Sequence, residues 1–383
     1  MITSLLDTFF NDIDLMIMLV GALVGIASSL VGTFLVLRGS SMLSDAIGHS
    51  IVFGIILVWL ITHQTSGPWQ ILGAALTGLL TVFLSELLIN TRKVKADAAI
   101  GLVFPVLFSL GILLINLYAS DVHIDAHTVL LGEIGFVWLD TLSIAGHDVP
   151  RAIVTMGSMT LINAAFIGLF YKELKLATFD APLAKALGFA PGILFYALLL
   201  LTSGTAVAAF DAVGAVLFVA FVIVPPSAAY LLTDRLWLMF LYGALISVTS
   251  SISGYYMAVW WDVSIGGMMA VMTGVFLSLA FLFGPRYGMA AQWLRRRQQR
   301  ALNDSRTLAV HLYNHEGGPE QDVENVTQAL REHLLWSSVR ANRVVERSCQ
   351  RQLITLQGER LALTETGRYL AREILEPGQH NHR

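Results

Sequence analysis

The sequence predicts an all-α polytopic membrane protein with about nine transmembrane helices and a small soluble α+β domain at the C-terminal end. Of the 383 residues, 55% are hydrophobic and 13% are charged, whereas a soluble domain carries about 25% charged residues. The charges gather toward one end, because the last 83 residues hold 10 of the 24 basic and 11 of the 27 acidic side chains. Lipid is therefore the expected solvent for most of the chain, and water for its last part.

The membrane part is predicted from apolar runs long enough to span a bilayer. Crossing about 30 Å of hydrocarbon takes about 20 helical residues. Nine runs meet this length or come close to it: 15–36, 46–62, 70–90, 98–118, 152–171, 192–210, 212–231, 236–260 and 263–284. We expect a membrane domain over residues 1–290, a basic linker over 291–302, a soluble domain over 303–376 and a disordered tail over 377–383.

Basic residues between the spans predict which loops face the cytoplasm, because Lys and Arg beside a span are retained on that side. Placing the Arg295–Arg297 cluster inside also puts every other basic residue before position 301 inside, except Arg151. The same placement leaves the N-terminus and an acidic segment at 119–150 outside. The C-terminal domain is then cytoplasmic.

Asp45 and His49, at the start of the second span, are the leading candidates for a functional site. An ionisable side chain at membrane depth costs about 2.5–3.5 kcal/mol on insertion scales, so its presence indicates function. Their i, i+4 spacing places both on one helical face, and oxygen and nitrogen ligands suit Mn, Fe or Zn better than Cu(I). Two ligands hold a metal poorly, but a partner across a twofold axis would supply a second pair. The pattern equally favours a structural alternative, in which the helix dipole stabilises Asp45 and His49 bonds a neighbouring helix.

Other candidates lie elsewhere in the predicted bundle. His123 and His127, in the outer segment, could gather metal there, although the segment also fits a short amphipathic turn. Asp211 sits at a predicted outer helix junction, where it lines an access path or is an exposed carboxylate at a loop end. Pro225 and Pro226, inside the seventh span, remove helix hydrogen bonds and predict a kink or break. A gating role and a purely architectural role for this pair both stay open.

Ordered motifs follow one another along the membrane part. They are Leu37-Arg38 through Ser44-Asp45-Ala46-Ile47-Gly48-His49-Ser50, Ala99-Ile100-Gly101-Leu102-Val103-Phe104 with Ser109-Leu110-Gly111, Phe179-Asp180 with Ala184-Lys185-Ala186-Leu187-Gly188, and Val213-Gly214 leading to Val224-Pro225-Pro226-Ser227-Ala228-Ala229. Over about residues 10–290 the chain resembles the permeases of manganese, zinc and iron chelate-type ABC importers, the ABC-3 family. In that family the Asp and His of the first motif coordinate the transported metal, and both stand here as Asp45 and His49. The sequence departs from the motif at Ser44, Ile47 and Gly48, where the family usually has Gly, Leu and Ser.

The resemblance implies a function and a set of partners. It implies a permease subunit in a bacterial inner (plasma) membrane that translocates Mn, Zn or Fe into the cytoplasm, with no enzymatic activity and no permanently bound cofactor. No Gly-x-x-x-x-Gly-Lys-Ser/Thr phosphate loop occurs in the sequence, so ATP hydrolysis is expected on a separate ABC subunit. An extracytoplasmic metal-binding lipoprotein or periplasmic binding protein would deliver the metal, and a second permease, identical or paralogous, would complete the assembly in membrane lipid.

The predicted cytoplasmic loop 172–188 is polar, basic and compatible with a helix. By resemblance it contains the coupling helix that docks into the ATPase subunit. The residues that match the family's motif in this loop are Phe179, Asp180, Ala184, Leu187 and Gly188.

From about Asn303 the pattern becomes that of a soluble domain. Amphipathic helices are predicted at 306–313, 323–335 and 339–349, followed by strands at 353–356 and 361–363 and a last helix that ends at Leu375. This order resembles the winged-helix domain of iron-dependent repressors. A basic face on the third helix keeps contact with nucleic acid open as an alternative; it consists of Arg340, Arg343, Arg347 and Arg351. However, a formal charge of −1 and the absence of lysine from the last 83 residues favour a regulatory or assembly role near the ATPase.

A membrane-anchored, metal-responsive transcriptional regulator is the alternative function, with the spans as sensor and the winged helix as output. The single cysteine, Cys349, is expected to be a buried core residue in a reducing cytosol. The histidines of the last part, which are His311, His315, His380 and His382, are too scattered along the sequence to predict a metal sensor.

Overall fold

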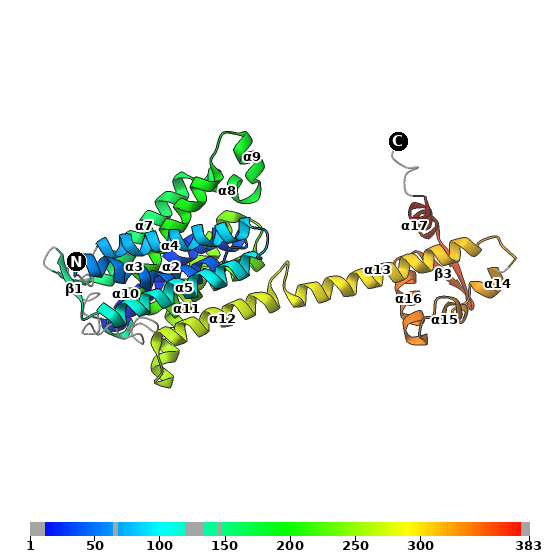
Figure 1. Cartoon of the computed structure of the whole chain (residues 1–383). Coiled ribbons are helices and arrows are strands. Elements are labelled where there is room, and N and C mark those ends of the chain that lie inside the picture. Colours follow the sequence, from blue (N-terminus) through cyan, green and yellow to red (C-terminus); the bar gives the residue numbers. More distant parts are fainter. Residues whose placement is uncertain (1–11, 64–67, 119–133, 145–146, 320, 377–383) are drawn as a thin grey trace. The chain divides into compact units, whose positions relative to one another are not determined.

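The computed structural model describes residues 12–63, 68–118, 134–144, 147–319 and 321–376. The chain separates into two compact units, Met1–Gly288 and Met289–Arg383, whose elements are labelled in Figure 1. Each unit has its own cluster of buried apolar side chains. We call the first the membrane unit and the second the soluble unit.

The membrane unit contains eight long apolar helices among the described residues. They are α2 (Ile13–Leu37), α3 (Met42–Thr62), α4 (Pro68–Asn90), α5 (Ala96–Tyr118), α7 (Arg151–Leu169), α10 (Pro191–Leu232), α11 (Leu236–Trp261) and α12 (Ile265–Phe283). Apart from α10 they have 19 to 26 residues each, the length that crosses a bilayer. Large apolar side chains such as Ile61, Leu161 and Trp260 are exposed, as expected where lipid is the solvent.

The helix α10 is too long for one crossing. Its 42 residues would extend about 60 Å as a straight helix, twice the hydrocarbon thickness. The backbone leaves the helical region at Gly214, where φ is 79° and ψ is 169°, a conformation that is essentially restricted to glycine. The described residues therefore contain eight long apolar helices rather than the nine predicted, because the expected spans 192–210 and 212–231 form the two pieces of α10 on either side of this break.

Contacts with α2 show that the chain turns back at the break. Asn163 of α7 donates hydrogen bonds both to the carbonyl oxygen of Ala27 on α2 and to the hydroxyl of Thr205 on α10. Beyond the break, the ring of Phe221 lies against Gly25, also on α2. In a straight helix Thr205 and Phe221 would be about 24 Å apart. The two pieces of α10, residues 191–213 and 215–232, therefore pack against the same stretch of α2.

Small residues and hydroxyl groups allow the helices to pack closely. A Cβ atom on Gly32 would lie 1.9 Å from the carbonyl oxygen of Val222, so only glycine permits this approach of α2 to α10. Between α3 and α4, the hydroxyl of Thr81 donates a 2.7 Å hydrogen bond to the hydroxyl of Ser50. This hydrogen bond pairs two buried hydroxyl groups inside the bundle, where an apolar solvent offers them no partner.

Shorter elements lie at two ends of the membrane unit. A 3-10 helix, η1 (Ile134–Phe136), precedes an antiparallel hairpin of β1 (Thr141–Ile144) and β2 (His147–Pro150), in which Thr141 pairs with Pro150. The helices α8 (Tyr171–Phe179) and α9 (Ala181–Ala186) connect α7 to α10. In Figure 1, β1 and the pair α8–α9 lie at opposite ends of the unit, as loops on opposite sides of a membrane would.

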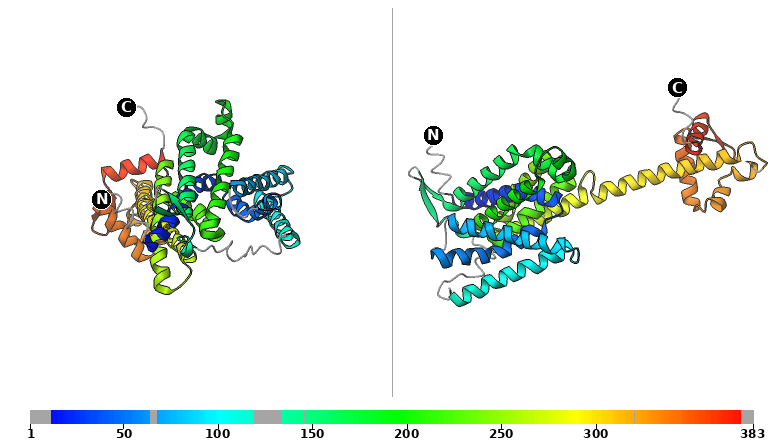
Figure 2. Two further views of the ribbon diagram at one scale, coloured as in Figure 1. Left: turned by 90° about the vertical axis from the view of Figure 1, so that its left-hand side faces the viewer. Right: turned by 45° about the horizontal axis from the view of Figure 1, so that its top comes forward.

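The soluble unit begins with α13 (Met289–His315), so the residues expected as a basic linker, 291–302, are part of a helix. The remaining elements are α14 (Gln321–Glu324), α15 (Ala329–His333), α16 (Ser338–Gln350), β3 (Ile354–Gln357), β4 (Arg360–Leu363) and α17 (Glu365–Leu375). Figure 2 shows them gathered around the C-terminal half of α13. Their core includes Leu308, Leu312 and Trp336.

The predicted hairpin of the soluble unit is confirmed, because β3 and β4 pair antiparallel with Ile354 opposite Leu363. The helix predicted over 323–335 is wrong. It divides into α14 and α15, and between them Val326 forms a β-bridge with Arg360. A backbone group engaged in a bridge to a strand cannot also continue a helical ladder, so the helix is interrupted there.

Candidate metal centre in the membrane unit

Asp45 and His49 lie on the first two turns of α3. The Nε2 atom of His49 is 3.4 Å from Oδ1 of Asp45, as the i, i+4 spacing predicts. Side-chain exposure is 40% for Asp45 and 33% for His49, whereas their neighbours Ala46 and Ile47 are buried. The pair therefore offers one carboxylate and one imidazole on the accessible side of an otherwise packed helix.

Aromatic rings from α5 border the imidazole. The ring of Phe104 stacks on that of His49 with centroids 5.6 Å apart, and the edge of Phe108 approaches at 6.0 Å. These contacts limit the rotation of the imidazole. The motif departure at Gly48 also has a structural setting, since a Cβ there would lie 3.2 Å from the ring of Phe210.

Within one chain this centre is incomplete. Over the part of the chain that the structure describes, no third His, Cys, Asp or Glu lies close enough to Asp45 and His49 to share an ion with them. Two protein ligands are fewer than the three or four that hold transition metals firmly. Either water and a neighbouring subunit complete the coordination, or the pair is structural.

Of the three residues expected on the access path, the structure describes Asp211. Asp211 is exposed on α10, three positions before the break at Gly214. It lies within electrostatic reach of Asp140 and Arg151, which form a 3.6 Å ion pair beside the β1–β2 hairpin. His123 and His127 lie outside the described residues.

The loop expected to couple to an ATPase forms two short helices with an apolar surface. Asp180 begins α9, because its carboxylate accepts a hydrogen bond from the backbone N–H of Leu183. The chain leaves α9 through Gly188 with φ of 86°, and Ala184 is buried. The apolar side chains exposed on this loop are Phe179, Leu183, Leu187 and Phe189. They form an exposed apolar patch on an otherwise charged loop.

The proline pair and the helix break are separate features. Pro225 and Pro226 are buried in the second piece of α10, whereas the non-helical backbone within α10 is at Gly214. The break lies 11 residues before Pro225, so the proline pair does not cause it.

Sequence reasoning missed one group of residues. His311 and His315 were interpreted as scattered, but the structure brings them together with Glu324 in the soluble unit. The signal that could have found them is the i, i+4 spacing of the two histidines on one helix. Glu324 gives no such signal, because it comes from a different helix.

A bundle of apolar helices long enough to cross a membrane defines a class, the polytopic membrane proteins. The sequence profile of the ABC 3 transport family matches residues 12–284. The chain belongs to this family.

Two curated relatives and one solved structure support this assignment. The chain is 44% identical to the zinc transport system membrane protein TroD of Treponema pallidum (strain Nichols) over 360 residues, which cover 94% of this chain and 98% of TroD. It is 47% identical to the manganese transport system membrane protein MntD of Bacillus subtilis (strain 168) over 276 residues, 72% of this chain and 93% of MntD. The structure of PsaBC from Streptococcus pneumoniae in complex with Fab is similar with a TM-score of 0.61 and 26% identity, covering 75% of this chain and 98% of that one.

These comparisons differ in how much of the chain they cover. The match to TroD is longer than the membrane unit, so it extends into the soluble unit. TroD and MntD are named as membrane proteins of transport systems rather than as enzymes.

Proposed function

We propose that the chain is the permease subunit of an ABC importer that moves a divalent transition metal, Mn, Zn or Fe, into the cytoplasm. The observation that carries this proposal is the Asp45–His49 pair, an oxygen and a nitrogen ligand 3.4 Å apart on α3 with both side chains accessible. TroD is named for zinc and MntD for manganese, and both metals accept this ligand set. The metal is the substrate, and it passes through the site.

The pair acts as an intermediate binding position on the metal's path. The Asp45 carboxylate supplies negative charge, which offsets the cost of moving a cation away from water, and a neutral His49 supplies an imidazole nitrogen. Two ligands from one chain bind the ion less firmly than a closed structural site. Weak binding suits a transport site, because the site must release the ion toward the cytoplasm.

The proposed importer has three further components. A second permease, identical or paralogous, supplies further ligands at the Asp45–His49 pair, because one chain offers two. A separate ATP-hydrolysing subunit docks on the apolar surface of α8 and α9. An extracytoplasmic binding protein delivers metal at the opposite end of the unit, where Asp211 is exposed.

We also propose that the soluble unit is a cytoplasmic winged-helix-like domain with a regulatory or assembly role. The order of α13 to α17, with β3 and β4 as the wing, supports this reading. One arginine of the basic face of α16 is engaged within the unit. Arg340 pairs with Asp304 of α13 at 2.6 Å. This contact competes with the use of Arg340 on nucleic acid.

Metal uptake by cells that express the complete transporter tests the proposal. With Asp45→Ala or His49→Ala, uptake should collapse while the chain remains in the membrane at normal abundance. Asp97→Ala is the matched control, because Asp97 is an exposed carboxylate in the first turn of α5, and uptake should be unaffected. Normal uptake in both site variants would remove the basis for the site.

Deleting residues 289–383 separates transport from the alternative function, a membrane-anchored transcriptional regulator. Uptake that persists without the soluble unit supports transport. Loss of a metal-dependent transcriptional response with intact uptake would support the regulator.

A further inference from the structure

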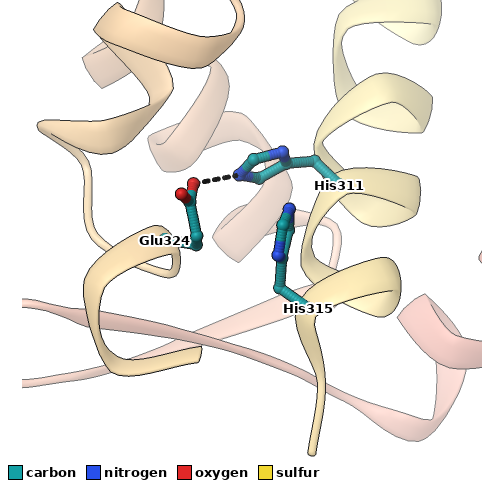
Figure 3. Close-up of side chains that lie close together, drawn as sticks. All are labelled: His311, His315 and Glu324. Atoms are coloured by element: carbon teal, nitrogen blue, oxygen red, sulfur yellow. Dashed lines mark ion pairs between the residues drawn. The ribbon is translucent and has the colours of Figure 1, made fainter. Parts of the chain in front are cut away.

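A second group of metal-binding side chains lies in the soluble unit. His311 and His315 are one turn apart on α13, and Glu324 is the last residue of α14. Figure 3 shows the ring of His311 and the carboxylate of Glu324 turned toward each other, with His315 beside them. One ligand atom from each of the three residues lies within 4.8 Å of the other two.

Two of these side chains are buried. His311 is 9% exposed and Glu324 is 7% exposed. The Nε2 atom of His311 has no hydrogen-bond partner among the described residues, because Oε2 of Glu324 lies 4.0 Å away, too far for a hydrogen bond. Leaving a buried nitrogen unpaired is unfavourable. A cation between Nε2 of His311 and the carboxylate of Glu324 would bind to both.

We propose that His311, His315 and Glu324 form a binding site for a divalent transition metal, with Zn²⁺ as the preferred ion. Two imidazole nitrogens and one carboxylate oxygen are a common ligand set for zinc, with a fourth position left open. Ligand atoms around a tetrahedral zinc, with bonds of about 2.0–2.2 Å, lie about 3.4 Å apart. The three ligand atoms therefore need to approach one another by roughly 1 Å, which side-chain rotation provides.

The surroundings of the site fit this assignment. His333, at the end of α15, places Nδ1 3.1 Å from Oε2 of Glu324, and its side chain is 49% exposed. It either orients the carboxylate or fills the fourth position. Burial is the main cause that lowers the pKa of His311, which favours the neutral imidazole that metals bind.

The simpler alternative is a buried His–Glu pair with no ligand. A pair of this kind is normally joined by a side-chain hydrogen bond, whereas Nε2 of His311 and Oε2 of Glu324 are 4.0 Å apart. The i, i+4 spacing on α13 also places the ring of His315 4.9 Å from that of His311, so a third ligand is available beside the pair. The cluster as a whole fits an ion better than a pair.

A bound ion would join α13 to α14 and thereby stabilise the soluble unit, because metal affinity for the folded state adds to the free energy of unfolding. The consequence for regulation rests on the proposed function. If the soluble unit is cytoplasmic, occupancy of this site reports the metal concentration on the side to which the metal is delivered. Metal binding itself does not depend on transport.

Zn²⁺ titration of the purified full-length chain, against a chromophoric competitor, tests the site. Three pairs of background substitutions remove the other candidate ligands: Asp45→Ala with His49→Ala, His123→Ala with His127→Ala, and His380→Ala with His382→Ala. We expect one equivalent of Zn²⁺ to bind. His315→Ala and Glu324→Gln should each weaken binding by roughly 100-fold or more, since even groups behind the ligands contribute about 10–100-fold. His63→Ala, a histidine at the end of α3, is the matched control and should change nothing.

Two further measurements keep the test independent of folding. His315 is partly exposed and Glu324→Gln keeps the shape of the side chain, so both variants should retain the helical circular dichroism of the background chain. Zn²⁺ should also slow amide hydrogen exchange in residues 316–328 of the background chain and leave exchange unchanged in His315→Ala. Absence of Zn²⁺ binding in the background chain, or an affinity in these two variants equal to that of the background chain, would overturn the proposal. Metal uptake plays no part in this experiment, so its outcome is separate from that of the proposed function.

Discussion

Nε2 of His49 lies 3.4 Å from Oδ1 of Asp45, and both side chains remain accessible on the surface of a single chain. A histidine that served only to hold the helices together would be expected deeper in the bundle, bonded to a neighbouring helix. His49 instead contacts apolar rings of α5 and one carboxylate on its own helix. The arrangement holds a carboxylate and an imidazole in place and leaves one side of the pair accessible, which supports the proposed metal position.

Replacing both Asp45 and His49 should lower the rate of metal uptake little more than replacing either residue alone. If Asp45 and His49 bind the same ion, Asp45→Asn and His49→Gln should each lower the rate of metal uptake by about 10–100-fold or more. The double variant should fall to a similar level, because residues that act as a unit give non-additive effects. Uptake rates at matched membrane abundance provide the measurement, and strictly multiplicative losses would argue for two independent roles.

The turn at Gly214 should be sensitive to any side chain. With φ of 79° and ψ of 169°, the backbone occupies a region where a non-glycine residue costs about 1–3 kcal/mol. Gly214→Ala should therefore lower the thermal unfolding midpoint of the purified chain. Gly274→Ala in α12 is the control, since a Cβ there meets no atom within 4 Å. Equal midpoints for the two variants would contradict the assigned strain.

The helices could be predicted from the sequence because their cause is local. About 20 apolar residues in succession suit a bilayer whatever they pack against, and the spacing of Asp45 and His49 alone places them on one face. The expected spans 192–210 and 212–231 place a boundary three residues before Gly214. The sequence alone does not show that Gly214 forms the turn, because a glycine among small residues also fits a straight, closely packed helix. Its role depends on how both pieces of α10 meet α2.

Prediction was weaker in the soluble unit, where tertiary contacts decide the local structure. The helix predicted over 323–335 is interrupted because Val326 pairs with Arg360, a residue far along the chain. The His311–Glu324 approach depends on the same fold, since α14 ends where its last residue faces α13. Periodicity places residues on a helical face, but it does not show which helix lies opposite.

The apolar surface of α8 and α9 should be necessary for binding the ATPase subunit. Leu187 is 60% exposed, and burying a leucine at an interface contributes about 1.5–3 kcal/mol. Leu187→Asp should weaken co-purification of the ATPase subunit by about 10–100-fold and reduce uptake to a similar degree. Leu139→Asp changes an apolar residue of 60% exposure next to the β1–β2 hairpin, at the opposite end of the membrane unit, and should leave the complex intact. Undiminished association of the Leu187→Asp chain would show that this surface does not couple.

Cys349 should react slowly with alkylating reagents, and the pH dependence should show why. Burial raises the pKa of the Cys349 thiol, and the thiolate is the reactive form. A raised pKa leaves less thiolate at neutral pH, so the alkylation rate should be below that of glutathione and should continue to rise at pH values where glutathione has levelled off. Iodoacetamide labelling of the full-length chain followed by mass spectrometry reports this rate without ambiguity, because the sequence has one cysteine. If hindered access alone slowed the reaction, the rate would be low, but the pH at which it reaches half its maximum would be the same as for glutathione. The attribution to desolvation would then be wrong.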